Sequence, residues 1–136
     1  MQFWRVSSST MVNVERGLAS KTWGFSPRWE GRCRLIRKGD KIAIYTSATH
    51  SFIAICEVTK EHFVDSSPIW PDDIYPHRIG IEPLPMPQKS IELKQVRTLA
   101  KRPRLGDSFQ PAIASLTPQD FNVILKLMTD KEAITT

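Results

Sequence analysis

The pattern of apolar and polar positions predicts strands through the first two-thirds of the chain. The segment 2–6 is predicted to form a strand, and a Lys38-Gly39-Asp40 turn leads into a second strand that runs to residue 47. The segment 51–63 is apolar on both faces in its first half, which is typical of a strand in a barrel wall. The short link between these two strands predicts a hairpin. A further strand is predicted over 76–84 and ends in a run of prolines.

Helical spacing of apolar residues marks two segments near the ends of the chain. The first covers 10–20 and follows several potential N-cap hydroxyls. The second is clearer, because Thr117 is a good N-cap, Pro118 suits the first helical position and Asp120 lies in the first turn. Its apolar face consists of Phe121, Ile124, Leu125 and Met128. The segment 91–99 is ambiguous between a strand and a short helix.

Three segments lack both patterns and are predicted to be loops. They are the aromatic-rich 21–31, the Pro- and Asp-rich 64–76 and the basic 101–111. Strands dominate the middle of the chain and helices lie near both ends. The predicted fold class is therefore α/β (α+β), a small mixed β-barrel of five or six strands with flanking helices. No repeat or boundary divides the chain, which predicts one domain over 1–130 and a tail or linker start over 131–136.

Charge and composition narrow the class of partner. The 136-residue chain carries 19 Lys and Arg against 14 Asp and Glu, a formal net charge of +5. Such an excess suits an anionic partner, either nucleic acid or a membrane surface. No apolar run approaches the roughly 20 residues of a membrane span, and no signal peptide is visible, so we expect a cytoplasmic protein without membrane contact. Cys33 and Cys56 lie outside any ligand motif and are predicted to be small buried hydrophobic residues.

Signatures of catalysis and of metal binding are missing from the sequence. It contains no GxSxG, HExxH, Walker or GxGxxG motif. His50, His62 and His77 are scattered, and none has a Cys, Asp or Glu at metal-ligand spacing. We therefore expect neither an enzyme nor a cofactor or metal. The alternative, a small hydrolase acting through His62 and Asp65, lacks the further converging acid and base groups that it would need.

Aromatic residues gather in the predicted loops. Trp23, Phe25 and Trp29 lie in one loop and Trp70 in another, where large rings suggest a binding surface. Trp23 and Trp70 are equally compatible with a pocket or with the core, and Trp29 with a structural or lid role. Basic residues lie near these rings, a composition typical of proteins that stack bases and contact phosphates; a solvated basic face is the alternative. The predicted phosphate contacts are Lys21, Arg28, Arg102 and Arg104.

Several short stretches occur in an order and spacing that resemble a known family. They are Phe3-Trp4, Trp23-Gly24-Phe25, the Lys38-Gly39-Asp40 turn before a strand that ends at Tyr45, IAICEVTKEHFVD (53–65), Tyr75-Pro76-His77-Arg78 and the helix LTPQDFNVILKLM (116–128). Together they cover nearly the whole chain and resemble the EVE domain family, a branch of the PUA-like superfamily related to YTH domains. The resemblance implies a PUA-like β-barrel that recognises modified bases in DNA or RNA.

The resemblance also implies where a base would bind. Trp23 and Trp70 match in position the two aromatic walls of the cage in YTH-like relatives. The groups implied to read the base edge are Ser7, Ser8 and Asn13, with the backbone of Gly24 and Phe25. Further candidates are Tyr45, Ser47 and Asp65. The first loop carries serines where YTH readers of methyladenine carry asparagine.

The predicted function is a nucleic-acid-binding reader that holds a flipped-out modified base, a modified cytosine or methyladenine, in an aromatic cage. DNA is favoured over RNA as the partner. The chain is compatible with a stand-alone protein and with the specificity module of a modification-dependent restriction system, fused to or associated with a nuclease or motor domain. Two alternatives stay open: an RNA-binding PUA-like module without preference for modification, and a protein-interaction domain that uses Trp70 and its Pro-rich loop.

Overall fold

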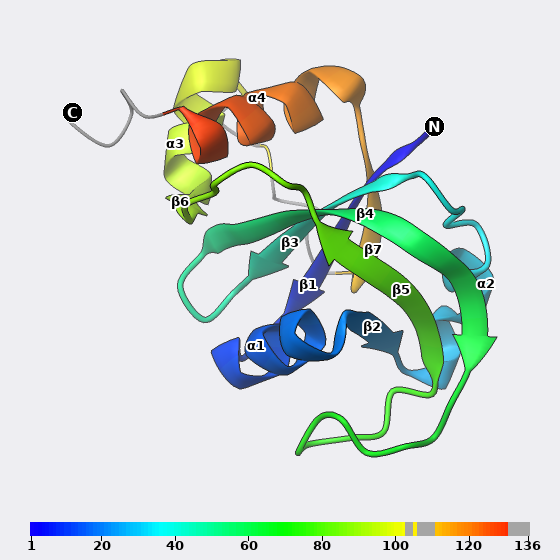
Figure 1. Ribbon diagram of the computed structural model, residues 1–136. Helices are drawn as coiled ribbons and strands as arrows, with labels where there is room; N and C mark the ends of the chain where they lie inside the picture. Colours follow the sequence, from blue (N-terminus) through cyan, green and yellow to red (C-terminus); the bar gives the residue numbers. More distant parts are fainter. Residues whose placement is uncertain (103–104, 106–110, 131–136) are drawn as a thin grey trace.

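A curved, seven-stranded sheet forms the centre of the computed structural model, which describes residues 1–102, 105 and 111–130 (Figure 1). Its hydrogen-bonded path runs β2-β5-β4-β3-β1-β7, and β6 pairs with β4. The elements in chain order are β1 (Phe3–Ser8), α1 (Met11–Ser20), β2 (Thr22–Phe25), the 3₁₀ turn η1 (Pro27–Trp29), α2 (Glu30–Cys33), β3 (Lys41–Thr46), β4 (Ser51–Val64), β5 (His77–Pro83), β6 (Ile91–Glu92), α3 (Leu93–Ala100), β7 (Ile113–Leu116) and α4 (Pro118–Thr129). The predicted tail, 131–136, lies outside the described residues.

The mixed α+β class is confirmed, but the sheet has seven strands rather than five or six and is not closed into a barrel. Its end strands, β2 and β7, share no ladder in the described part of the chain. The chain leaving β2 instead runs through α2 towards β7, where the Arg32 guanidinium donates to the Ile113 carbonyl (2.8 Å). Cys33 and Ile36 from this segment are fully buried. A helical segment therefore completes the wall that strands would form in a closed barrel.

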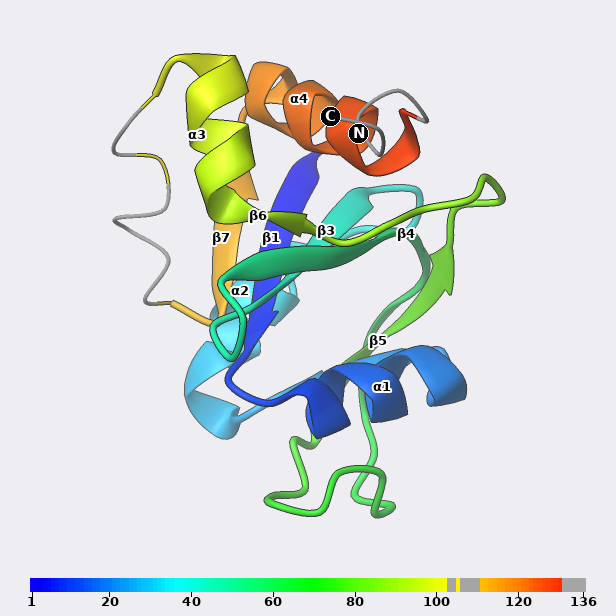
Figure 2. The same cartoon turned by 90° about the vertical axis from the view of Figure 1, so that its left-hand side faces the viewer.

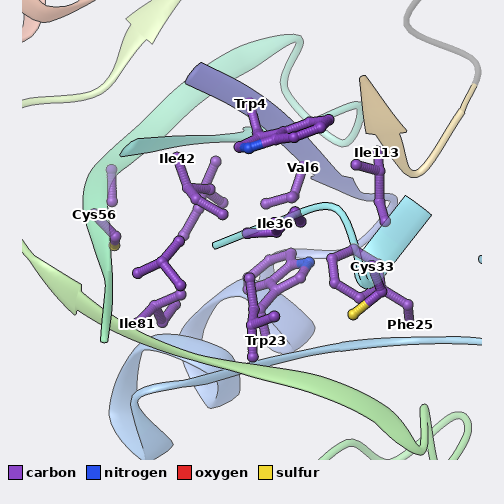
Figure 3. Packing of buried hydrophobic residues seen from close by; sticks show 14 of the residues in the cluster. Trp4, Val6, Trp23, Phe25, Cys33, Ile36, Ile42, Cys56, Ile81 and Ile113 are labelled. Atoms are coloured by element: carbon purple, nitrogen blue, oxygen red, sulfur yellow. The ribbon is translucent and has the colours of Figure 1, made fainter. Parts of the chain in front are cut away.

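Apolar side chains cover both faces of the sheet. The first cluster joins β1, β2, β3 and the segment after α2 (Figure 3). The second lies between the sheet and helices α3 and α4, which sit together at one end of the molecule (Figures 1 and 2). β3 serves both clusters, because Ile42 and Ile44 join the first while Ala43 and Tyr45 join the second. Burying each large apolar side chain contributes about 1.5–3 kcal/mol, so both faces stabilise the fold.

Most predicted elements are confirmed. The β3–β4 hairpin forms, and both helix N-caps are present: Thr10 Oγ1 accepts from the Asn13 amide (3.3 Å) and Thr117 Oγ1 from the Asp120 amide (3.1 Å). The ambiguous segment 91–99 divides into β6 and the start of α3. The predicted loop over 21–31 is wrong, because it contains β2, η1 and α2. A four-residue strand is too short to show alternation and is defined by its pairing with β5.

Two expectations drawn from composition can be compared with the structure. Cys33 and Cys56 are free and buried, as expected. Burial raises the pKa of both thiols to about 12, so they stay protonated at neutral pH. Across the described residues, no helix combines the length and apolar character that a membrane crossing requires.

Candidate functional site

A cavity of about 220 Å³ opens where the two ends of the sheet fail to meet. Its walls come from the end of β1, the start of α1, β2, η1 and the loop between β4 and β5. That loop and α1 lie side by side at one end of the molecule (Figures 1 and 2). We call this cavity the β2 pocket, and its lining residues are Ser7, Ser8, Ser9, Asn13, Trp23, Gly24, Phe25, Ser26, Trp29, Trp70, Tyr75 and Ala112.

Trp23 lies in a strand rather than in a loop, and most of its ring belongs to the core. Only 4% of the residue is exposed. Gly17 of α1 leaves room for the ring, since a Cβ at that position would lie 2.8 Å from Cε3 of Trp23. Figure 3 shows Trp23 among the buried side chains of the first cluster, below Ile36. Trp23 therefore connects the pocket to the core, and a substitution there affects both.

β2 is an end strand, so one of its edges is available to a ligand. The Ile81 amide of β5 donates to the Lys21 carbonyl (3.0 Å). Hydrogen-bonded and non-hydrogen-bonded pairs alternate along an antiparallel ladder, so Trp23 and Phe25 share their backbone groups with β5. The amide and carbonyl of Gly24 point to the free edge, in the pocket that Gly24 lines. One donor and one acceptor are thus held in fixed positions beside the cavity.

Trp70 covers the other face of β2. A Cβ on Gly24 would lie 2.6 Å and 2.7 Å from Cζ3 and Cη2 of Trp70. The ring can therefore pack against β2 only because residue 24 is glycine. The Trp70 indole donates to the Asn13 carbonyl (3.1 Å), and the Tyr75 ring packs edge-on with centroids 5.6 Å apart. Successive side chains of a strand point to opposite faces. Trp23 therefore reaches the pocket from β2 itself, whereas Trp70 reaches it from the loop that covers the opposite face of this strand.

The loop that carries Trp70 is tied to α1 through Asp72. The Asp72 carboxylate accepts from Asn13 Nδ2 (2.9 Å) and from the Tyr75 hydroxyl (2.7 Å). Desolvation opposes ionisation, but these two hydrogen bonds, together with those from the backbone amides of Asp72 and Asp73, outweigh it and hold the pKa of Asp72 below its usual value. Burial and the bond to Asp72 raise the pKa of Tyr75 to about 12. The tyrosine hydroxyl therefore stays a donor at neutral pH, and the link between loop and helix is kept.

Arg78 of β5 anchors the loop between β4 and β5 through hydrogen bonds. Its side chain is fully buried, and its guanidinium donates to the carbonyls of Ser67, Ile74 and Tyr75 and to the Ser67 hydroxyl. The guanidinium carbon also lies 5.2 Å from the ring centre of Trp70. A single buried side chain thus satisfies several loop acceptors at once, which fixes the backbone on either side of Trp70.

The R78M variant is expected to release this loop. Removing a buried charged donor leaves the loop carbonyls without partners and costs about 3 kcal/mol or more of stability. Urea unfolding measures the loss, and limited proteolysis tests for new cleavage within 65–76. R37M is the control, because the Arg37 side chain forms an exposed ion pair with Glu61 (3.0 Å) and such pairs contribute about 1 kcal/mol or less. A loop that stays protected in R78M contradicts the anchoring role.

Seven of the residues predicted to bind a base line the β2 pocket: Ser7, Ser8, Asn13, Trp23, Gly24, Phe25 and Trp70. Three others do not line it. Tyr45 points into the second cluster, and its hydroxyl lies 3.3 Å from His50 Nδ1. Ser47 is exposed in the turn after β3, and Asp65 lies 3.5 Å from the Arg78 guanidinium. Tyr45 lies one residue before the end of β3 and pairs with the pocket residue Ser7, but its place in the alternation turns it towards α3 and α4.

Other pocket residues were not among the predicted base-binding groups. The sequence predicts a structural or lid role for Trp29, and Tyr75 occurs only within a stretch that carries the resemblance. Both supply rings to the cavity. The signal for Trp29 was its place in the same aromatic group as Trp23, whereas Tyr75 is brought in by its bond to Asp72. Ser9, Ser26 and Ala112 line the cavity through their position alone, and no sequence signal marks them.

The predicted phosphate contacts are spread over the surface. Arg28 lies over the Trp29 ring, 5.0 Å from its centre, and so stands at the rim of the pocket. Lys21 forms an exposed ion pair with Glu82 (3.2 Å), and Arg102 pairs with the buried carboxylate of Asp120. Arg104 lies outside the described residues. Among the other three, Arg28 is the cation that contacts a pocket side chain.

Comparison with known proteins shows which folds share this arrangement. The sequence matches the family described as EVE domain over residues 3–127, and no curated protein matches it. The YTH domain of the Zygosaccharomyces rouxii MRB1 protein, solved in complex with N6-methyladenosine RNA, aligns with a TM-score of 0.74 at 15% identity, over 95% of this chain and 87% of that one. Protein Atu2648 from Agrobacterium tumefaciens aligns with a TM-score of 0.64 at 20% identity, over 92% of each chain. Rpa0253 from Rhodopseudomonas palustris aligns with a TM-score of 0.65 at 20% identity, over 94% of this chain and 93% of that one.

Proposed function

This chain belongs to the EVE domain family, and we propose that it binds nucleic acid and holds one extruded, modified base in the β2 pocket. The observation that carries the proposal is the lining of the pocket, where three tryptophans, a free strand edge and several hydroxyls surround about 220 Å³. Sites for drug-sized ligands span roughly 300–1,000 Å³, so this volume suits a single flat heterocycle. The matches reported above indicate no catalytic family, which favours binding over catalysis.

Each part of the pocket supplies one element of base recognition. The rings of Trp70 and Trp29 offer stacking surfaces, and the backbone of Gly24 offers a donor and an acceptor to a base edge. The hydroxyls of Ser7 and Ser8 can supplement these bonds. A base with a mismatched edge would leave a buried polar group unpaired, at a cost of about 1–3 kcal/mol. A methyl group in an apolar part of the cage would add about 1–3 kcal/mol of discrimination.

The energies of these steps are compatible with binding. Extruding a base from a duplex costs a few kcal/mol, and least for a base that is already single-stranded. Stacking on an aromatic ring returns about 1–3 kcal/mol. Contacts between cations and phosphates supply the remainder and make affinity fall as salt rises. Single-stranded ligands are therefore expected to bind more tightly than duplexes of the same sequence.

The nature of the nucleic acid is the next variable. The sequence favours a modified cytosine or methyladenine in DNA, whereas the related Zygosaccharomyces structure contains methyladenosine RNA. The proposed contacts are to the base rather than to the sugar. The base modification and the sugar of the oligonucleotide, deoxyribose or ribose, can therefore be varied separately in a binding assay. Fusion to or association with a nuclease or motor domain stays a prediction from the resemblance.

A binding screen tests the proposal. DNA and RNA oligonucleotides of one sequence would carry methylcytosine, hydroxymethylcytosine, glucosylated cytosine, N6-methyladenine or no modification. We expect at least one modified oligonucleotide to bind about tenfold or more tightly than its unmodified counterpart, a difference of about 1.4 kcal/mol. Equal affinities throughout would indicate a nucleic-acid-binding module without preference for modification. No binding at low salt would exclude both functions.

The R28E variant is expected to weaken binding of all oligonucleotides by a similar factor. Its guanidinium lies beside Trp29 at the pocket rim, where a phosphate next to an extruded base would pass. Losing one phosphate contact lowers the slope of log affinity against log salt by roughly 0.7–0.9, which fluorescence anisotropy over a salt series can measure. K126E is the control, because Lys126 is exposed on α4 at the other end of the molecule (Figure 1). Identical salt slopes in the two variants would remove Arg28 from the interface.

A further inference from the structure

Three side chains from three different elements converge beside the β2 pocket. Glu30 begins α2, His62 lies near the end of β4 and His77 begins β5. Figure 1 shows these three segments close together at one edge of the molecule. One ligand atom from each residue lies within 4.8 Å of the others. We propose that Glu30, His62 and His77 form a binding site for a divalent transition-metal ion, with Zn²⁺ as the ion that suits it best.

The two imidazole rings already present nitrogen atoms to one another. His62 Nε2 and His77 Nδ1 are 2.9 Å apart, and the ring planes differ by only 16°. In this pair one ring donates its N–H to the other. Two nitrogens bound to a tetrahedral Zn²⁺ at about 2.0–2.1 Å lie about 3.3 Å apart. Replacing the shared proton by an ion therefore requires a separation of about 0.4 Å more, together with rotation of the rings.

Glu30 supplies a third, charged ligand. One of its carboxylate oxygens accepts from the Arg34 guanidinium (2.9 Å), which leaves the other oxygen for an ion. Carboxylates that bind metals are commonly held by such outer partners. Three protein ligands of the type His₂Glu leave one coordination position for water. All three side chains are half-buried, so an ion can enter from solvent.

The predicted absence of a metal role for the histidines rests on spacing along the chain, and spacing cannot detect this cluster. His62 and His77 are brought together because β4 and β5 are antiparallel neighbours. Glu30 joins them because the chain after β2 folds back over this end of the sheet, where α2 contacts β5. The ligands therefore come together only in the tertiary structure.

An ion at this site would also hold one wall of the β2 pocket. Trp29, which lines the pocket, directly precedes Glu30. His77 pairs with the pocket residue Phe25 across the β2–β5 ladder. The ion would thus join the segment that carries Trp29 to the sheet. This consequence rests on the proposed function, whereas binding of the ion does not.

Isothermal titration of the chelator-treated chain with Zn²⁺ tests the proposal. We expect one Zn²⁺ per chain and a rise in melting temperature. H62A and H77A should each weaken the affinity by more than about tenfold, since the loss even of outer-shell partners commonly costs about 10–100-fold. H50A is the matched control, because His50 lies in the β3–β4 turn next to Tyr45 and outside the cluster. E30Q should weaken binding while keeping the size of the side chain.

Absence of binding by the wild-type chain would overturn the proposal, as would binding that survives in the H62A/H77A double variant or disappears in H50A. Substitution by Co²⁺ gives a test that needs no variant. The bound Co²⁺ is expected to show the visible absorption typical of nitrogen and oxygen ligands. A thiolate-to-metal charge-transfer band would instead assign the ion to Cys33 or Cys56 and contradict the site. Neither experiment contains nucleic acid, so each result is independent of the proposed function.

Discussion

The W70A variant is expected to lose about 5- to 150-fold in affinity for the modified oligonucleotide, together with most of its preference for the modified base. This range corresponds to the roughly 1–3 kcal/mol of one base–aromatic stack. Trp70 is buried, with 6% of the residue exposed, and is packed between β2 and Tyr75, but it belongs to neither core cluster of the described residues. W70A should therefore lower the melting temperature, while the two clusters that stabilise the sheet stay intact. Affinities for modified and unmodified oligonucleotides, with circular dichroism and melting temperature, measure both effects.

Two further variants separate the ring from other contributions. W70F keeps an aromatic face but removes the N–H that donates to the Asn13 carbonyl, so it should retain most of the preference. W23A is not an equivalent test, because Trp23, unlike Trp70, lies in the first cluster, which stabilises the sheet. Truncating such a core residue costs about 3–5 kcal/mol, and lost binding would then reflect lost folding. If W70A discriminates between bases as well as the wild type does, Trp70 is not a wall of the site.

The G24A variant is expected to reduce binding of the modified oligonucleotide by about 10–100-fold, close to the effect of removing Trp70. The added Cβ would lie 2.6 Å from the Trp70 ring and 2.8 Å from Cβ of Tyr75. Neither neighbour is the end of a flexible side chain, so the indole must leave its seat. Overpacking of this kind costs about 1–3 kcal/mol of stability. Binding assays and urea unfolding measure the two losses separately.

A double variant and a matched glycine sharpen this test. In G24A/W70A the new Cβ no longer meets an indole, although Cβ of Tyr75 still lies 2.8 Å away. The G24A substitution should therefore weaken binding much less in the W70A background than in the wild type. Strong coupling of this kind is expected between residues in direct contact and not between distant, independent sites. G31A is the control, because a Cβ on Gly31 would meet nothing within 4 Å. If the G24A and W70A effects simply add, the contact between Gly24 and Trp70 does not shape the site.

Where periodicity is strong, the sequence was sufficient to predict the fold. The long β4 strand, the β3–β4 hairpin and the capped helix α4 follow from alternation, turn chemistry and an N-cap threonine. The short strands β2 and β7 could not be found in this way. Each has four residues and is defined by pairing with β5 or β1, strands that lie far away along the chain. The open edge of the sheet could not be predicted either, because it depends on α2 lying beside β7, and tertiary contacts alone place α2 there.

The candidate site was predicted in part. The resemblance led to Trp23, Trp70, Asn13 and the first-loop serines, and the structure brings these residues to one cavity. Tyr45 was misplaced because β3 is buried on both faces, so its position near the opening did not settle which way it points. The supporting roles of Asp72, Tyr75 and Arg78 could not be predicted, although Tyr75 and Arg78 belong to a stretch that carries the resemblance. Arg78 is charged and fully buried, a state that composition does not signal.

Whether a base enters the β2 pocket is tested most directly by NMR. Amide and indole spectra of the ¹⁵N-labelled chain would be recorded alone and with the tightest binder from the screen. The Gly24 amide and the Trp70 and Trp29 indole signals should show the largest shifts, while signals from α4 should stay unchanged. Large shifts confined to the α3–α4 face, with Gly24 and Trp70 unaffected, would contradict a base-binding role for the pocket.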